Sequence, residues 1–164
     1  MADRRATRRV REQAERFLRT GIAEVGLGPR PHRVRSPIPI VDPEGRLHSW
    51  FVPVTSGDTL LGFLQILPDL ALMRSSSFQR HAGSVEGCPE AAAWLDSAVI
   101  RQRASARLRR GEQPGEPFLT YDGQPTRLVW AVPVTARSGR ARVIFVAGDY
   151  VFEPRRDGGR LGLL

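Results

Sequence analysis

Residues 50–55 of the chain read WFVPVT and residues 130–135 read WAVPVT, so one phrase recurs after 80 positions. A spaced W-x-V-P-V-T pattern of this length is typical of an internal duplication. A duplicated unit fixes the architecture, because each copy is expected to adopt the same local structure. We therefore expect one domain over residues 1–154, made of two repeats at about residues 1–80 and 81–154.

Further matches extend the repeat on both sides of this phrase. Two pairs keep the offset of 80, and two later pairs require two residues inserted in the intervening turn. The pairs are Pro37 with Pro117, Asp42 with Asp122, Gly57 with Gly139 and Phe63 with Phe145. The sequence thus predicts that the two halves share their strands and turns.

Each half opens with a helical pattern. In the first half an apolar stripe at i, i+4, i+7 and i+8 predicts a helix over about residues 7–22. The stripe consists of Val10, Ala14, Phe17 and Leu18, and the expected supporting ion pairs are Glu12–Arg16 and Glu15–Arg19. The glycines at 26 and 28, followed by Pro29, are expected to end it.

The second half carries a comparable helical signal. Pro89 is typical of a helix start, and Asp96 is expected to cap a further helical stretch. Its apolar positions are Ile100, Ala104 and Leu108, and Gly111 is expected to stop it.

Four extended segments follow the helical region in each half. They cover residues 36–41, 47–55, 60–67 and 71–78 in the first half and 117–121, 127–135, 141–147 and 150–153 in the second. Short turns join them, which favours antiparallel pairing because parallel strands need long crossovers. The predicted fold class is α+β with an internal duplication, each half a helix region followed by four antiparallel strands.

The repeated phrase also predicts where the core lies. Alternate residues of a strand share a face, so the tryptophan and both valines of each phrase lie together. The expected core trios are Trp50, Val52 and Val54, and Trp130, Val132 and Val134. Proline cannot donate to a ladder, so Pro53 and Pro133 predict bulges or unpaired edge positions. Residues 143–146 are all apolar, so both faces of this strand are apolar, which predicts a central strand covered on both sides.

The composition is that of a globular protein with a strongly basic balance. All 25 basic residues are arginine and the formal net charge is +8, a bias that reflects GC-rich coding more than any site. The single cysteine excludes an internal disulfide framework and fits a reducing compartment. No stretch resembles a signal peptide or a membrane span, so we expect a cytoplasmic protein without a membrane partner.

An acidic-glycine turn precedes the tryptophan strand in both halves. The turns are Val41-Asp42-Pro43-Glu44-Gly45 before Trp50 and Tyr121-Asp122-Gly123 before Trp130. In this feature and in its helix-then-strands plan the chain resembles cystatin-like and PepSY-like modules. The resemblance implies a non-catalytic binding domain, such as a propeptide or an inhibitor. The Q-x-V-x-G segment of true cystatins is not found, which argues against protease inhibition.

Only one candidate for nucleophilic catalysis stands out. Cys88 precedes Pro89 at an expected helix start, where the helix dipole lowers a thiol pKa, and His81 lies seven residues upstream. The alternative is a buried or capping thiol, which is the common state of a free cysteine. The repeated Asp42 and Asp122 fit turn chemistry, with a catalytic carboxylate pair as the alternative.

Cofactor and metal motifs are missing from the sequence. His32, His48 and His81 show no metal-ligand spacing, and no glycine-rich phosphate loop follows a strand, so neither a metal nor a cofactor is expected.

Two arginine runs are candidate polyanion sites. One includes Arg4, Arg5, Arg8 and Arg9 and the other includes Arg107, Arg109 and Arg110. If both helices lay on one side of a sheet, the runs would merge into one basic surface for nucleic acid. The alternative is two solvated amphipathic helices.

The C-terminal residues 155–164 read as a flexible tail with an apolar end. Glycines followed by Leu161, Leu163 and Leu164 are similar in style to the targeting peptides of encapsulin cargo proteins. A frayed terminus is the alternative. Taken together, the sequence predicts a non-enzymatic protein-binding or assembly module, with polyanion binding, tail-directed docking in a shell and a Cys88 thiol enzyme as the other hypotheses.

Overall fold

A computed structural model describes residues 4–28 and 30–154 of the chain. The fold is α+β, as predicted, with three helices and ten strands among the described residues. The chain divides into two compact units. Unit 1 comprises the described residues up to Ile40 together with Leu47–Ala91, and unit 2 comprises Val41–Arg46 together with the described residues from Ala92 onward.

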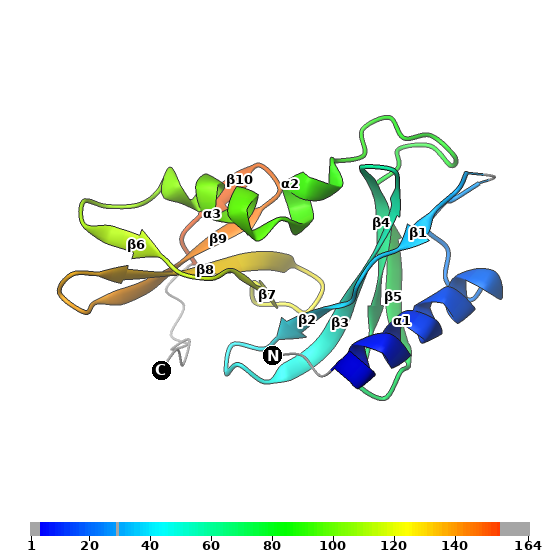
Figure 1. Cartoon of the computed structure of the whole chain (residues 1–164), viewed down its shortest axis with the longest axis horizontal. Coiled ribbons are helices and arrows are strands. Elements are labelled where there is room, and N and C mark those ends of the chain that lie inside the picture. The colour runs from blue at the N-terminus through cyan, green and yellow to red at the C-terminus, as the bar shows by residue number, and fades with distance from the viewer. Residues whose placement is uncertain (1–3, 29, 155–164) are drawn as a thin grey trace. The chain divides into compact units, whose positions relative to one another are not determined.

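Unit 1 contains one long helix and an antiparallel set of strands (Figure 1). The elements are α1 (Arg4–Arg19), β1 (Arg33–Val34), β2 (Ile38–Val41, whose last residue belongs to unit 2), β3 (Leu47–Ser56), β4 (Thr59–Ile66) and β5 (Leu72–Ser77). Strand β3 pairs with β4, β4 pairs with β5, and β1 pairs with the end of β3. Each of these pairings is antiparallel.

Unit 2 has a broken helical region followed by strands (Figure 1). Its elements are α2 (Ala91–Leu95, whose first residue belongs to unit 1), α3 (Ser97–Ser105), β6 (Glu112–Pro114), β7 (Phe118–Tyr121), β8 (Leu128–Ala136), β9 (Ala141–Ala147) and β10 (Tyr150–Phe152). Strand β8 pairs with β6, β7 and β9, and β9 also pairs with β10. The central position of β9, with residues 143–146 buried, confirms the prediction for this strand.

The core of unit 1 lies between α1 and one face of the strands. Val10, Ala14 and Phe17 of the helix are buried in one cluster with Trp50, Val52 and Val54. The predicted helix stripe and the first predicted trio are thus confirmed. Gly62 of β4 is needed here, because a Cβ at this position would lie 3.1 Å from the Val25 side chain and still closer to the Ser76 carbonyl.

The second trio is also buried, in unit 2. Trp130, Val132 and Val134 are 7%, 0% and 1% exposed, and the Trp130 indole N–H donates to the Trp94 carbonyl at 2.8 Å. Helix α3 packs against β8 and β9, with Ile100 and Ala104 fully buried. The hydrogen bond matters because a buried indole N–H without a partner would cost stability.

The prediction of four strands per half is wrong, because each half has five. Strands β1 and β6 each come just before the first predicted strand of their half, residues 36–41 and 117–121. They are two and three residues long and pair only with the far ends of β3 and β8. Too short to show a hydrophobic period, they are defined by their partners and not by their own sequence.

The repeated prolines occupy unbulged positions. Pro53 lies opposite Phe63 and Pro133 opposite Val143, both in register. The bulge of the β3–β4 hairpin lies on β4 at Leu61. Each proline carbonyl accepts a hydrogen bond from the neighbouring connector, from Arg35 at 2.8 Å and from Gly115 at 2.7 Å. The missing N–H therefore falls where pairing of β3 with β1, and of β8 with β6, has ended.

The predicted pairing of Phe63 with Phe145 at an offset of 82 is wrong. In register, Ile66 faces Trp50 and Val146 faces Trp130, so the offset returns to 80 beyond the turn. The turn between β8 and β9 is one residue longer than the turn between β3 and β4. The bulged residue Leu61 on β4 makes up for this difference. Gly57 and Gly139 accordingly lie at opposite ends of their turns.

Both helices end earlier than predicted. Helix α1 stops at Arg19, and Gly21 follows with φ of 71°, a left-handed conformation that glycine adopts without strain. Helix α3 begins at the predicted cap, where Asp96 Oδ1 accepts from the Ala98 amide at 2.8 Å. It ends at Ser105, so Leu108 lies outside it. None of the described helices combines the length and apolarity that crossing a membrane requires.

Candidate functional site

A groove lies beside the C-terminal end of α1 in unit 1. Its first hollow, of about 270 Å³, is formed by the helix end and the segment that follows it. The lining residues are Leu18, Gly21, Ala23, Glu24, Val25, Gly26, Leu27, Gly28 and Ala82. The hollow lies where the chain leaves the helix, passes the left-handed Gly21 and continues in a segment without regular structure, in which Gly26 and Gly28 also have positive φ.

A second hollow of about 270 Å³ adjoins the first at Leu18. Glu15, Leu18 and Arg19 of α1 line it together with His32 and Val34. Leu18 and Val34 give it an apolar floor, and the three ionisable residues surround that floor. We call the two hollows together the helix-end groove.

The segment 23–28 makes few backbone hydrogen bonds with the described residues. The amides of Glu24 and Leu27 donate none to a backbone carbonyl of these residues, whereas the Gly26 carbonyl accepts one from the Gly83 amide at 3.2 Å and Val25 is buried. Ile22 lies in the chain between the lining residues Gly21 and Ala23, and its side chain is 61% exposed.

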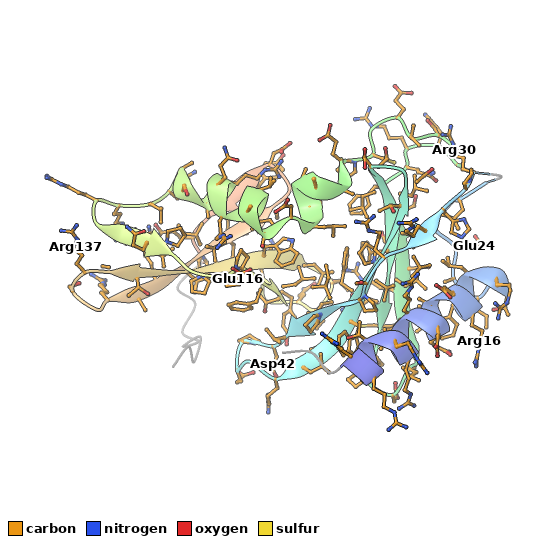
Figure 2. All side chains as sticks on the ribbon, viewed as in Figure 1. Arg16, Glu24, Arg30, Asp42, Glu116 and Arg137 are labelled. Carbon is orange, nitrogen blue, oxygen red and sulfur yellow. The ribbon has the colours of Figure 1, made fainter. Side chains whose placement is uncertain are left out.

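The charges around the groove are uneven. Among the described residues, Glu24 has no ion pair or hydrogen-bond partner for its side chain, and the same holds for Arg19 and His32. Glu15 is compensated, because Arg11 lies 3.2 Å from it. Both Glu24 and the nearby Arg16 lie at the surface of unit 1 (Figure 2).

The first arginine run covers the solvent side of α1. Arg4, Arg5, Arg8 and Arg9 are all exposed. The ion pairs of this helix are Arg8–Glu12 and Arg11–Glu15, both at 3.2 Å, and not the predicted Glu12–Arg16 and Glu15–Arg19. Each acid turns to the arginine that precedes it, which leaves Arg16 and Arg19 at the helix end outside these pairs.

The second run does not continue a helix. Arg107, Arg109 and Arg110 follow the end of α3 in a chain of turns. Arg107 supplies its carbonyl to Arg142, and Arg109 forms an ion pair with Glu153 at 3.3 Å. Of the three side chains in this run, that of Arg109 is thus engaged within unit 2, whereas Arg107 contributes only its backbone carbonyl.

An ion cluster in unit 2 was not predicted from the sequence. Arg142 of β9 binds both carboxylate oxygens of Glu112, at 2.8 and 2.7 Å, and also Glu153 at 2.9 Å. Its side chain is 15% exposed and that of Glu112 is 8% exposed. The hydrogen bonds from Arg142 lower the pKa of Glu112 to about 2, and those to Glu112 raise the pKa of Arg142. The partners are 30 residues apart, so no local pattern announces them.

Cys88 and His81 lie in the loop that follows β5. Burial raises the pKa of the Cys88 thiol, the direction opposite to that of an activated nucleophile. Among the described residues no hydrogen bond joins this thiol to His81, which is exposed. Helix α2, which Cys88 precedes, has only five residues and a correspondingly small dipole.

The repeated aspartates hold turns together. Asp42 accepts hydrogen bonds from the amides of Glu44 and Arg46 and from the Arg46 guanidinium. Burial acts to raise its pKa, but the bonds from Arg46 outweigh this and lower it. Asp122 faces Arg127 at 3.4 Å across the equivalent turn. This geometry is that of turn residues whose carboxylates are engaged by arginine.

Comparisons of the chain with protein-family models, with curated proteins and with solved structures find no match. No group of three or more metal-ligating side chains is brought together within the described part of the chain. The tail residues Leu161, Leu163 and Leu164 lie outside the described residues. The helix-end groove is thus the described feature best suited to recognition.

Proposed function

We propose that the protein is a non-enzymatic protein-binding module, and that the helix-end groove takes an extended segment of its partner. The observation that carries this proposal is that Leu18 lines two hollows beside an irregular segment, in which the amides of Glu24 and Leu27 have no backbone partner among the described residues. Backbone pairing gives such a site affinity, and side-chain hollows give it selectivity. No chemical step belongs to the proposal, because the Cys88 thiol is shifted away from reactivity.

The proposal includes an origin of the chain by internal duplication. Its support is the constant offset between strand registers: Val34 faces Val54 as Pro114 faces Val134, and Trp50 faces Ile66 as Trp130 faces Val146. A cystatin-like or PepSY-like ancestry of each half is part of the same proposal. So is a cytoplasmic location, which the single cysteine favours.

A second candidate function is polyanion binding along α1. Arg5, Arg9 and Arg16 fall at i, i+4 and i+11 on one stripe of the helix, whose acidic member at i+7, Glu12, lies 3.2 Å from Arg8. Retardation of DNA or RNA that falls steeply with salt, and that Arg9→Gln with Arg16→Gln weakens, would support this function. Docking in a shell through the C-terminal tail is a third hypothesis, and deletion of residues 158–164 tests it.

Selection from a displayed library of random octapeptides on the full chain tests the main proposal. We expect enriched peptides to lose about tenfold in affinity on Ile22→Asp, because burial of an aliphatic side chain at the rim is replaced by a solvated charge. Leu47→Asp is the matched control, since Leu47 is a partly exposed leucine of unit 1 that lines neither hollow. Leu18→Ala tests the side chain that lines both hollows. Its melting temperature, measured in parallel, separates a loss of binding from a loss of folding.

An absence of enriched peptides would contradict the proposal. Equal losses on Ile22→Asp and Leu47→Asp would contradict it as well, because binding would then not depend on the groove.

A further inference from the structure

We propose that the C-terminal residues 155–164 pack against the face of the unit 2 strands that lies opposite helices α2 and α3. This inference goes beyond the proposed function, which concerns the helix-end groove of unit 1. It gives the tail a binding site within its own chain, whereas the shell hypothesis gives it a site on another protein.

The strands of unit 2 have two different faces. On one face the Trp130 indole bonds to the carbonyl of Trp94 in α2, and the Arg142 guanidinium bonds to the carbonyl of Arg107, just after α3. Both helices lie on this side of β8 and β9 (Figure 1). The alternate residues of the same strands point the other way. We call this second surface the helix-free face, and its central residues are Val129, Ala131, Val143 and Phe145.

The helix-free face is buried, although its described cluster consists of one layer. The four central residues are each 6% exposed or less. Every described member of the cluster belongs to β7, β8, β9 or β10, and none to a helix. Neighbouring side chains shield a ring such as that of Phe145 from the sides, but a second layer has to lie over it. A segment outside this cluster therefore covers the face.

One residue from each strand forms a row across this face. Phe118 lies opposite Ala131, which in turn lies opposite Phe145, and Phe145 lies opposite Phe152. The rings of Phe145 and Phe152 meet edge to face, with their centroids 5.7 Å apart. Ala131 is the position at which the two repeated phrases differ, because unit 1 has Phe51 there. The small side chain between two rings suits an aliphatic side chain packed over the middle of the row.

The chain leaves β10 at this face. Phe152 lies on the face, and the next residue, Glu153, is held on the helical side by Arg142 at 2.9 Å. Residues 155–164 therefore start from a defined point at the edge of the helix-free face. The sequence of the tail supplies aliphatic side chains at Leu161, Leu163 and Leu164, and two of these share a face when the segment is extended.

The tail is long enough to cover the whole face. Seven residues lead from Pro154 to Leu161, and fully extended they span about 23 Å. The four strands from β10 to β7 are separated by three spacings of about 4.8 Å, or about 14 Å in all. The difference leaves room for a change of direction at Gly158 and Gly159, so the leucines can reach any of the four strands.

Methyl NMR of the full chain tests this inference with two triple variants. The leucine variant should shift the methyl resonances of Val129, Ala131 and Val143, because it removes the aliphatic cover, and should leave that of Ala104 in α3 unchanged. Its melting temperature should fall by about 3 °C, whereas the arginine variant should keep the wild-type values of both. The leucine variant is Leu161→Ser, Leu163→Ser and Leu164→Ser, and the arginine variant is Arg155→Ser, Arg156→Ser and Arg160→Ser.

Three outcomes would overturn the inference. They are unchanged methyl resonances in the leucine variant, equal shifts in the two triple variants, and wild-type resonances of these methyls that vary with protein concentration, since a second copy would then occupy the face. If the leucine variant also shifts Ala104, the milder Leu163→Ala tests the same contact by the same resonances. None of these outcomes concerns the helix-end groove, which the peptide selection tests separately.

Discussion

The two units employ the same arginine-rich composition in different ways. In unit 2, arginines join separate elements: Arg142 connects β9 to β6 through Glu112, and Arg103 pairs with Asp149 at the β9–β10 turn. In unit 1, the ion pairs Arg8–Glu12 and Arg11–Glu15 each join two residues of the same helix, α1. The remaining cations at the helix end therefore stay available to a partner.

Similar strands thus carry two different helical layers. In one unit the arginines pair with other elements, and in the other a hollow lies beside the helix. Both units bury a tryptophan and two valines on a long central strand. Unit 2 breaks its helical region into two short helices, and several of its arginines, such as Arg103 and Arg142, form ion pairs with residues of other elements. Unit 1 has one continuous helix that ends at Gly21 and leaves the groove beside it.

The largest expected effect comes from the two tryptophans. Trp50→Ala and Trp130→Ala should each lower the free energy of unfolding by about 3–5 kcal/mol, because each leaves a cavity in a packed core. Trp130→Phe should cost more than Trp50→Phe, because it also removes the hydrogen bond to the Trp94 carbonyl. Urea unfolding measures both. If either alanine variant kept the wild-type midpoint, that result would contradict the claim that both tryptophans are core residues of their units.

The next effect distinguishes arginines that join elements from those that do not. Arg142→Met should clearly lower the urea midpoint, because it leaves the carboxylate of Glu112 without its partner. Arg8→Met, on a side chain that is 80% exposed, should leave the midpoint nearly unchanged. Equal midpoints for the two variants would remove the distinction between the units.

The pH dependence of stability sharpens the same point. The pKa of Glu112 is lowered from 4.5 to about 2, so its pairing stabilises the fold fully above pH 4.5 and the stabilisation is lost as the pH falls toward 2. Thermal unfolding between pH 5 and pH 2 should therefore show a smaller loss on acidification for Glu112→Gln than for the wild type. Identical pH profiles would show that this carboxylate does not titrate with folding.

The smallest effect concerns the start of α3. Asp96→Ala should cost about 1 kcal/mol, because the Ala98 amide loses its acceptor. Asp149→Ala, whose side chain is 95% exposed in its pair with Arg103, should cost close to nothing. Chemical denaturation compares them, and a larger loss for Asp149 would mean that the cap contributes little.

The sequence predicted those features that rest on local pattern. Eight of the ten described strands, the two tryptophan trios and the Asp96 cap follow from alternation, repetition and capping chemistry. Strands β1 and β6 were missed because their short sequences, Arg-Val and Glu-Gln-Pro, carry little strand signal, whereas β10, also of three residues, consists of Tyr-Val-Phe, which all favour strands. The end of α1 was misplaced because Gly21 was passed over in favour of the glycines before Pro29.

The candidate site was largely beyond reach of the sequence. The groove is assembled from residues between 15 and 34 together with Ala82, and its shape depends on how the chain turns after Gly21. The arginine count indicated a basic surface but not which arginines would be engaged. Arg142 and Glu112 meet only through the pairing of β6 and β9 with β8.

Hydrogen exchange of the full chain, with and without an enriched octapeptide, tests the central claim most directly. The account predicts slower exchange for backbone amides between residues 15 and 34 on binding, with amides of residues 97–153 unchanged. Protection confined to residues 97–153, or no protection by a peptide that binds, would contradict it.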